Sequence, residues 1–581
     1  MLGRSVESNL SRLFLIGLPI ATVFIFMNVN DPVNTPKMLI TGSLAGGVCA
    51  IALVFGLKQL WVDSKLLLIS GMIFLLAMLN SIFQSASPLI QNINGAQGRN
   101  TGFLTYLFLL LVALGAALLR EKSSFLYLSV AFVIAGTINI IYGAWTILFG
   151  DFLPWKNSED LVIGFFGNTN FMGSFLGMFT AAAIAWSLSG KLVIWQRFLL
   201  LAFSTLAFYE IIESKATQGI VVFLTGLFIV GFYFLRSKTK SSVPTFIYSS
   251  IGAALGATAV LGILQRGPLT EYIYKSSVSF RGQYWRAGIE MGNANPLSGV
   301  GMDAYGDNYR KFRSQVAATT TPGPDTTADS AHNVIIDFFA SGGWPLLLSY
   351  LATLIIASIA LVRVTRRDRT YKPEFVAIAS VWICYQLQSI VSINQIGLAI
   401  WGWVLTGALV GYERATRNVT IDSEELGEKG SKANLTSSKK IRSKRSKRKE
   451  TEQGFTPGLV GAIGVAIGLL VALPPLTSDL KWRSSFSNFN PQTIEEDTKP
   501  TYFAPTNSFL VVSYGMLLES NEYYDLSYKF AKRAVEFNPD NFRSWQLLLS
   551  VTNATLEDKL QATANMKRLD PLNPGLNNVN P

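Results

Sequence analysis

His332 is the only histidine in a chain of 581 residues. It lies at the end of a long polar segment, residues 265–333, directly before an apolar run. Histidine is the one side chain whose unperturbed pKa allows proton exchange near neutral pH. A lone histidine is more often structural than catalytic. Its position between a polar loop and an apolar run, however, favours a catalytic or substrate-contacting role.

The same polar segment contains a group of basic side chains, namely Arg281, Arg286, Arg310, Lys311 and Arg313. Guanidinium forks bind phosphate oxygens in pairs, so this group predicts a phosphorylated substrate. The alternative is a solvated basic face whose charges pair with acidic residues of the same loop. The sequence PLSGVGMDAYGD within the segment indicates a glycine-rich turn, because it lacks the Gly-Lys-Ser/Thr ending of a phosphate-cradling loop.

Three shorter segments also contain side chains suited to chemistry. Arg99 stands where a predicted membrane span begins, and Lys215 follows Glu213 at the end of another. Ionisable groups at a span end are costly and suggest a function, although a self-contained Glu–Lys pair is an alternative. Residues 164–178, GFFGNTNFMGSFLGM, include Asn168 and Asn170 among glycines. Such residues suit a close backbone approach, either to a ligand or to another helix.

Metal and cofactor chemistry has little support in the sequence. Cys49 and Cys384 both lie inside apolar runs without metal-ligand spacing. A histidine-rich site is excluded with one histidine, and nothing supports a carboxylate site of the magnesium type. We therefore expect no cofactor, and from the residues alone a carboxylate site of the magnesium type stays open.

The elements that must position these residues are membrane spans. Half of the residues are hydrophobic and only 15% are charged, which is too few for a water-facing surface. Apolar runs of about 20 residues recur along the chain and predict an all-α, polytopic membrane protein with about 13 transmembrane helices. We place them near 11–29, 38–57, 65–84, 102–119, 125–149, 168–188, 198–214, 219–235, 245–264, 334–362, 374–391, 397–412 and 457–473.

Lysine and arginine gather in alternate loops and in the run Lys439–Lys449, which predicts that these segments and the N-terminus are cytoplasmic. Segment 265–333 then faces away from the cytoplasm. The net charge of +12 lies mostly in these loops and in the linker, so membrane lipid is a better partner for it than nucleic acid.

The chain divides into four predicted parts. Residues 1–412 form the membrane domain, 413–456 a basic disordered linker, 457–473 the last span, and 477–581 an extracytoplasmic helical tail. The tail has helical periodicity with an Asn-Pro turn, and VEFNPDN is echoed about 32 residues later by KRLDPLN. This spacing is typical of a tetratricopeptide-like helix pair. One repeat and a fragment bury little core, so we expect the tail to pack on the membrane domain or on a partner.

Over residues 90–412 these segments together resemble the O-antigen ligase and polymerase superfamily of bacterial transferases. The resemblance rests on Gly98-Arg99-x-x-Gly102, on Gly167-Asn168-x-Asn170, on Ser214-Lys215, on Arg281 with Trp285, on PLSGVG, on AHN before a downstream Gly-Gly, and on SINQIGLAIWGWVLTGAL. Members of the family usually have Ser-Arg where this chain has Lys215. Lysine keeps the charge and loses the fork.

The resemblance implies a GT-C-like fold in the bacterial cytoplasmic membrane and a glycosyltransferase without a metal. An undecaprenyl-pyrophosphate-linked glycan is the implied donor, and a hydroxyl of a lipid, glycan or protein is the acceptor. Arg281, with Arg286 or Lys215, is then expected to hold the diphosphate while His332 orients or deprotonates the acceptor. Arg99, Asn168, Asn170 and Trp285 are the further substrate-binding candidates.

Several alternatives remain open at this stage. The chain resembles ligases and polymerases equally, and the tail suits the presentation of a protein acceptor. A transporter or flippase of glycan-lipid is a rival from another class, although no repeated half is visible. A non-catalytic scaffold that docks partners through its tail is a third.

Overall fold

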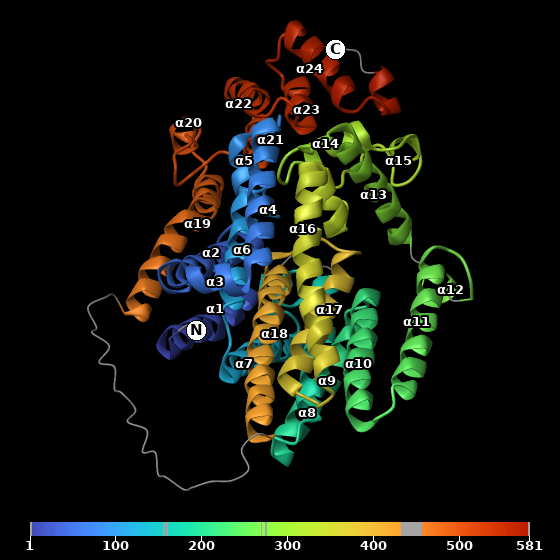
Figure 1. Ribbon diagram of the computed structural model, residues 1–581. Helices are drawn as coiled ribbons and strands as arrows, with labels where there is room; N and C mark the ends of the chain where they lie inside the picture. The colour runs from blue at the N-terminus through green and yellow to red at the C-terminus, as the bar shows by residue number, and fades with distance from the viewer. Residues whose placement is uncertain are drawn as a thin grey trace.

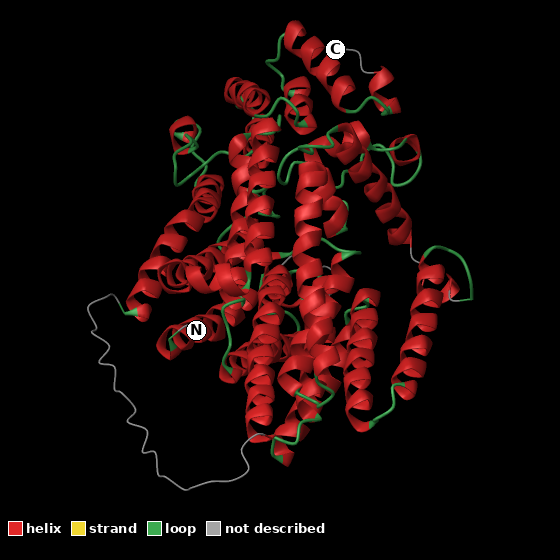
Figure 2. Cartoon of the chain, viewed as in Figure 1, coloured by secondary structure: helices red, strands yellow, loops and turns green. Residues whose placement is uncertain are grey.

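The computed structural model describes residues 3–154, 157, 161–268, 270–273, 276–431 and 456–578. Within these ranges the regular structure is helical and no strand occurs (Figures 1 and 2). The basic run Lys439–Lys449 lies outside the described residues. The predicted all-α class is thus confirmed.

Each of the predicted spans corresponds to a helix. These helices are α1 Arg4–Val23, α2 Asn34–Ile51, α4 Lys65–Gln84, α6 Phe103–Ala116, α7 Lys122–Phe149, α8 Thr169–Ser187, α9 Ile194–Glu213, α10 Thr217–Lys238, α11 Val243–Ile263, α16 Val334–Arg367, α17 Pro373–Ser389, α18 Ile396–Ser431 and α19 Pro457–Ser487. α2 continues through the π-helix Ala52–Gly56 into α3 Leu57–Asp63. α18 runs beyond the predicted end of its span, through residues that we expected in the linker.

Eight helices of the described chain are long and apolar enough to cross a membrane. They are α2 with α3, α4, α7, α10, α11, α16, α18 and α19. α6 is apolar but has only 14 residues. The chain is therefore a polytopic membrane protein by length and composition.

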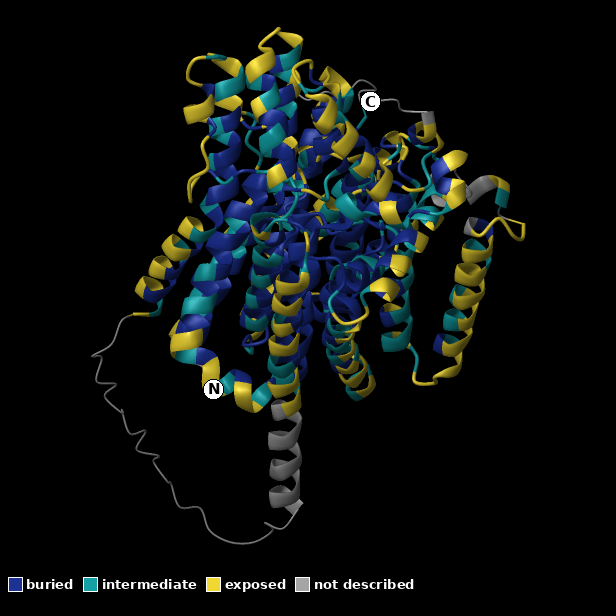
Figure 3. Cartoon of the chain, turned by 90° about the horizontal axis from the view of Figure 1, so that it is seen from above, coloured by how far each residue is buried: buried dark blue, intermediate teal, exposed yellow. Residues whose placement is uncertain are grey.

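Burial is highest at the centre of the helix bundle (Figure 3). The apolar window of α18 is completely buried, whereas that of α11 is only 11% buried. α11 lies at the edge of the bundle in Figure 1. In a membrane the exposed apolar side chains of α11 would contact lipid. Their low burial within the protein is therefore consistent with a span at the periphery of the bundle.

The polar segment between α11 and α16 folds into short helices with a core of its own. It contains α12 Thr270–Ile273, α13 Ser276–Ala294, α14 Tyr305–Phe312 and α15 Gln315–Thr319. Buried side chains of this core include Met291, Tyr305, Tyr309, Ala328 and Ala331. We call the end of the bundle that bears this segment the loop end.

A break in α16 joins the polar segment to the bundle. Gly343 has φ 62° and ψ −159°, a conformation open essentially only to glycine. Residues of PLSGVG form hydrogen bonds with the backbone groups on either side of this break. Val300 N donates to Ala340 O at 2.9 Å, and Gly301 N donates to Ser341 O at 3.1 Å. In the other direction, Trp344 N donates to Pro296 O at 2.8 Å. The Gly-Gly pair and PLSGVG therefore form one structural joint.

The tail is helical and lies above the loop end in Figure 1. It contains α20 Ile494–Asp497, α21 Ser508–Ser520, α22 Tyr524–Phe537, α23 Phe542–Ser550, α24 Leu556–Leu569 and a 3-10 turn Pro574–Asn578. It has its own core, which includes Trp482, Tyr514, Phe530 and Leu548. The antiparallel helices are those expected for a helix-pair repeat, and the tetratricopeptide assignment itself stays a prediction.

Candidate functional site

Arg99 occupies the centre of the loop end. It precedes α6 in a turn where Gly95 and Gly98 have positive φ. Its Nε lies 3.3 Å from Asp303 Oδ1, and its Nη1 lies 3.3 Å from Asp329 Oδ1. Only 9% of Arg99 is exposed. The ion pairs lack hydrogen-bond alignment, because Nε and Nη1 are both buried donors without a hydrogen-bond acceptor among the described residues.

Asp303 connects the two loops that meet at Arg99. Its Oδ2 accepts hydrogen bonds from Ala96 N at 2.8 Å and from Thr101 N at 3.1 Å. Burial alone would lower the pKa of Arg99, but Asp329, Asp303 and Asp337 raise it overall. The guanidinium therefore stays charged in a site that is largely closed to water.

Backbone geometry fixes His332 at the start of α16. His332 has φ 53°, in the left-handed region that non-glycine residues rarely occupy. On one side, Ala331 N donates to Asp337 Oδ1 at 2.7 Å. On the other, Asn333 caps α16 by accepting from Ile335 N and Ile336 N. These two anchors hold the histidine in a strained conformation, which is typical of functional sites.

The surroundings of His332 keep its imidazole neutral. Burial lowers the pKa of His332 to about 4; Asp329 acts to raise it, and Arg281 and Arg99 act to lower it. The imidazole is therefore unprotonated at physiological pH and has a free nitrogen lone pair. Asp329, Arg281 and Arg99 all lie within electrostatic range of the histidine.

Arg281 reaches this group from α13. Tyr284, one turn further along, lies with its ring centroid 5.7 Å from that of His332. The pKa of Tyr284 is raised by its burial and by Asp329, and Arg281 acts to lower it. Burial also lowers the pKa of Arg281. Arg281 and His332, which are 51 positions apart in the sequence, therefore belong to one cluster with Arg99, Tyr284 and Asp329.

Other predicted residues take different positions. Arg286 is exposed on α13, away from the face that bears Arg281. Trp285 is half-buried against the core of the polar segment, and its Nε1 has no hydrogen-bond partner among the described residues.

Asn168 caps α8 by accepting a hydrogen bond from Asn170 N at 2.8 Å. Further along, a Cβ on Gly219 of α10 would come within 2.9 Å of the Gly173 backbone. The glycines of residues 164–178 thus allow close helix packing, and Asn168 starts the helix.

Lys215 lies in the turn between α9 and α10 with φ 54°. It is exposed at the loop end, close to Ser214, whose hydroxyl donates to Ile211 O. The turn is tied to α17, where Gln218 Nε2 donates to Gln388 Oε1 at 3.2 Å. Its part in substrate binding stays a prediction.

Two of the predicted phosphate-binding arginines have another role. Arg313 forms a bidentate pair with Asp570 of the tail, at 2.7 and 2.8 Å, and Arg310 contacts the same carboxylate at 2.8 Å. Asp570 and Arg313 are 1% and 2% exposed. The interpretation of these two side chains as substrate ligands is replaced by this pairing. The carboxylate comes from the tail and not, as the alternative supposed, from the loop itself.

Sequence reasoning missed the acidic members of the cluster. Asp329 and Asp337 lie three positions before and five after His332, and Asp303 follows PLSGVGM. Their nearness to the histidine and to the glycine-rich turn was the available signal. Sequence reasoning also missed Tyr284, and the available signal was its position one helical turn from Arg281.

Comparison with known proteins places this cluster in a family. No curated protein matches the chain. Residues 201–351 match the family described as O-antigen ligase. This range contains Lys215, Arg281, His332 and the joint at Gly343. Residues 201–351, about a quarter of the chain, are therefore similar to O-antigen ligases.

Proposed function

We propose that the chain transfers a glycan from a polyprenyl-pyrophosphate donor to an acceptor hydroxyl at the loop end. The observation that supports this most directly is the cluster at the loop end, where His332 lies against Tyr284 and within electrostatic range of Arg281, Arg99 and Asp329. A phosphate-binding cation beside a proton acceptor is the pair of groups that such a transfer needs.

In this mechanism Arg281 binds the pyrophosphate and stabilises the negative charge that develops as the donor bond breaks. Arg99 is paired with Asp303 and Asp329, and it holds the Asp329 carboxylate in the cluster. His332 accepts the proton of the acceptor hydroxyl. The acceptor oxygen forms the new bond to the anomeric carbon, the bond from that carbon to pyrophosphate breaks, and the lipid pyrophosphate leaves.

In this mechanism Asp329 stabilises the protonated form of His332. Its side chain is 62% exposed and pairs with Arg99. Its negative charge favours the protonated form of His332. That charge stabilises the imidazolium that forms when the hydroxyl proton arrives.

The orientation of the chain in the membrane is also part of the proposal. Basic side chains collect at the other end of the bundle, where Arg120, Arg236 and Arg367 lie. Cytoplasmic loops are enriched in lysine and arginine, so we place the loop end on the extracytoplasmic side of a bacterial inner membrane. A donor there is lipid-linked, because nucleotide sugars remain in the cytoplasm.

The test is a transfer assay with purified protein in lipid nanodiscs. The reaction contains a polyprenyl-pyrophosphate-linked glycan with lipid, glycan and peptide acceptors, and the products are identified by mass. We expect a new glycosidic product that His332→Ala reduces by at least about 100-fold. Arg266→Ala, which removes an exposed cation of the same segment outside the predicted phosphate-binding group, is the matched control and should leave the rate unchanged.

The result also separates the rival functions. Movement of the glycan-lipid across the membrane without a new bond would support a transporter. Loss of function on deletion of residues 480–581, with His332→Ala and Arg281→Ala both active, would support a scaffold. The acceptor that is modified distinguishes a ligase from a polymerase or from a protein glycosyltransferase.

A further inference from the structure

A cavity of about 500 Å³ lies at the opposite end of the bundle from the candidate site. Its walls come from α7, α10, α16, α17 and α18 and from the connection between α16 and α17. α16 joins the two places, because His332 directly precedes this helix and Arg367 ends it. The part of α16 beyond its break at Gly343, Trp344–Arg367, is by itself roughly 36 Å long, so the cavity is a separate site.

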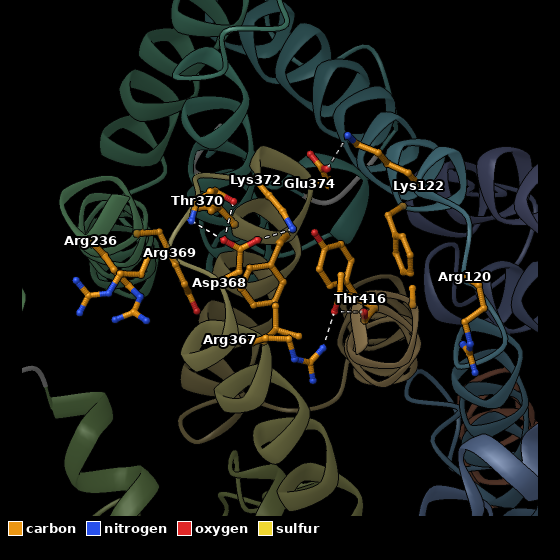
Figure 4. A pocket seen from close by; sticks show the side chains of 17 residues that line it. Arg120, Lys122, Arg236, Arg367, Asp368, Arg369, Thr370, Lys372, Glu374 and Thr416 are labelled. Atoms are coloured by element: carbon orange, nitrogen blue, oxygen red, sulfur yellow. Dashed lines mark hydrogen bonds and ion pairs between the residues drawn. The ribbon is translucent and has the colours of Figure 1, made fainter. Parts of the chain in front are cut away.

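Basic side chains surround the cavity (Figure 4). They are Arg120, Lys122, Arg236, Arg367, Arg369 and Lys372. Two carboxylates also line it. Asp368 pairs with Lys372 at 2.6 Å, and Glu374 pairs with Lys191 at 3.1 Å and with Lys122 at 3.7 Å. Each carboxylate is therefore already neutralised by a lysine.

Two more carboxylates behind the cavity neutralise two of the arginines. Arg120 contacts Asp63 at 3.2 Å, and Arg367 contacts Glu413 at 2.6 Å. These pairs neutralise the positive charge of Arg120 and Arg367, which lie at the right and in the lower part of Figure 4. The positive charge that remains is concentrated on the other side, at Arg236 and Arg369.

Arg236 and Arg369 contact only neutral oxygens among their described hydrogen-bond partners. Arg236 Nη2 donates to Thr365 O at 2.7 Å, and its buried Nε has no acceptor within the described chain. Arg369 donates to the carbonyls of Thr239 and Lys240 and to Ser242 Oγ. The two guanidinium groups lie beside each other in Figure 4. Two adjacent like charges without an anion favour the binding of one.

The floor of the cavity is aromatic. Tyr412 lies between Phe125 and Phe375, with ring centroids at 4.9 and 5.1 Å, and Phe375 contacts Tyr233 at 5.6 Å. All four rings line the cavity and are nearly buried. A basic rim above an apolar floor matches a ligand that joins a phosphate to an apolar group.

We propose that this cavity binds the phosphate head group of an anionic phospholipid, with Arg236 and Arg369 as its main contacts. Basic pockets between transmembrane helices are known to hold such head groups. Membrane topology alone accounts for basic residues in the cytoplasmic loops. It does not account for their convergence on a cavity with an aromatic floor. A soluble phosphate has the same head-group chemistry and lacks the apolar part that the floor accommodates.

Lipid retention by the full-length protein tests this proposal without any transfer assay, so it stands apart from the proposed function. Protein purified in detergent is stripped of lipid and then incubated with phosphatidylglycerol or phosphatidylcholine. Native mass spectrometry counts the lipid that remains bound. We expect selective retention of phosphatidylglycerol, reduced about tenfold in the double variant Arg236→Gln, Arg369→Gln.

The matched control is Lys238→Gln with Arg366→Gln. These exposed residues lie on the same helices, α10 and α16, and their replacement removes the same charge outside the cavity. The control should retain phosphatidylglycerol like the wild type, and the charge-preserving pair Arg236→Lys, Arg369→Lys should retain more than the glutamine pair. Equal retention by the glutamine pair and the control would overturn the proposal.

Two further arms complete the test. Glycerol 3-phosphate and inorganic phosphate compete with the lipid, and displacement at equal concentration would instead assign the cavity to a soluble phosphate. If the double variant does not elute as a single species, Arg236→Gln alone replaces it. This change removes one hydrogen bond to Thr365 and should lower retention about threefold.

Discussion

At the scale of single residues, the loop end combines a strained histidine with two buried or half-buried guanidinium groups. His332 is held in a left-handed conformation between the Asp337 contact and the Asn333 cap. The sequence predicted His332 from residue type and position, and it singled out Arg281 from the basic group of the loop through the family resemblance. It did not predict Asp303, Asp329 or Asp337, because isolated carboxylates in a loop are common and only the fold gathers these three around Arg99.

The lowered pKa of His332 gives a pH dependence that can be measured. The group is neutral above its folded pKa of about 4, whereas an ordinary histidine becomes neutral only above about 6.5. We therefore expect the acidic limb of the kcat/KM profile well below pH 6.5, near pH 4. The kcat profile should have its limb at higher pH, since a bound pyrophosphate favours the imidazolium. Identical limbs near pH 6.5 in both profiles would contradict this role.

The lowered pKa of His332 also predicts the direction in which the stability of the protein changes with pH. The folded pKa of His332 lies below the unfolded value, so the unfolded chain binds the proton more readily between the two. Stability from this group is intact above about pH 6.5 and falls as the pH drops toward 4. Thermal melting of His332→Gln should show a smaller loss over this interval than the wild type.

Arg281 tests the phosphate contact directly. Arg281→Lys keeps the charge and loses the fork, so we expect a donor KM about tenfold higher. Arg281→Ala removes both and should lower kcat/KM by about 100-fold or more. Steady-state kinetics with varied donor gives both numbers, with Arg266→Ala as control. An Arg281→Ala protein within twofold of the wild type would exclude the contact.

At the scale of elements, the predicted spans coincide with helices because apolar runs and helix-start signals are local properties of the sequence. α4 begins and ends within the predicted 65–84. The break in α16 was not predicted. A Gly-Gly-x-Pro sequence permits a break, and the hydrogen bonds from PLSGVG that stabilise it come from about 40 residues upstream.

Gly343→Ala tests this joint. An alanine does not readily adopt φ 62°, and its Cβ would lie 2.3 Å from Pro296 O. We expect a destabilisation of about 1–3 kcal/mol from backbone strain, with faster hydrogen exchange at Val300 and Gly301. Gly256→Ala in α11, where a Cβ meets nothing within 4 Å, is the control and should be neutral or slightly stabilising. Unchanged melting of Gly343→Ala would show that the break is relaxed.

At the scale of the whole molecule, the tail and the polar segment form one assembly at the loop end. Besides the Asp570 pairs, Asn538 and Asn541 donate to Asp307 of α14 at 3.1 and 2.8 Å. The sequence predicted that the tail packs on the membrane domain or on a partner, because one helical repeat has too little core. It could not identify the partners, since the pairing joins residues about 260 positions apart.

Asp570→Ala should loosen this assembly. Removal of one partner of a buried ion pair leaves uncompensated charge and costs about 3–5 kcal/mol. We expect faster hydrogen exchange in α14 and α24. Asp540→Ala breaks the exposed pair with Arg568 in the same tail and should change stability by about 1 kcal/mol or less. Equal protection of α14 in both variants would mean that the tail is held by other contacts.

The pairing of Asp570 with Arg310 and Arg313 also sets an order of events during synthesis. The two arginines leave the ribosome about 260 residues before the carboxylate that neutralises them. At about 5–20 residues per second this interval is roughly 10–50 s. The polar segment therefore remains incomplete until Asp570 has been synthesised. A nascent chain that stops before Asp570 leaves the two arginines without their buried partner.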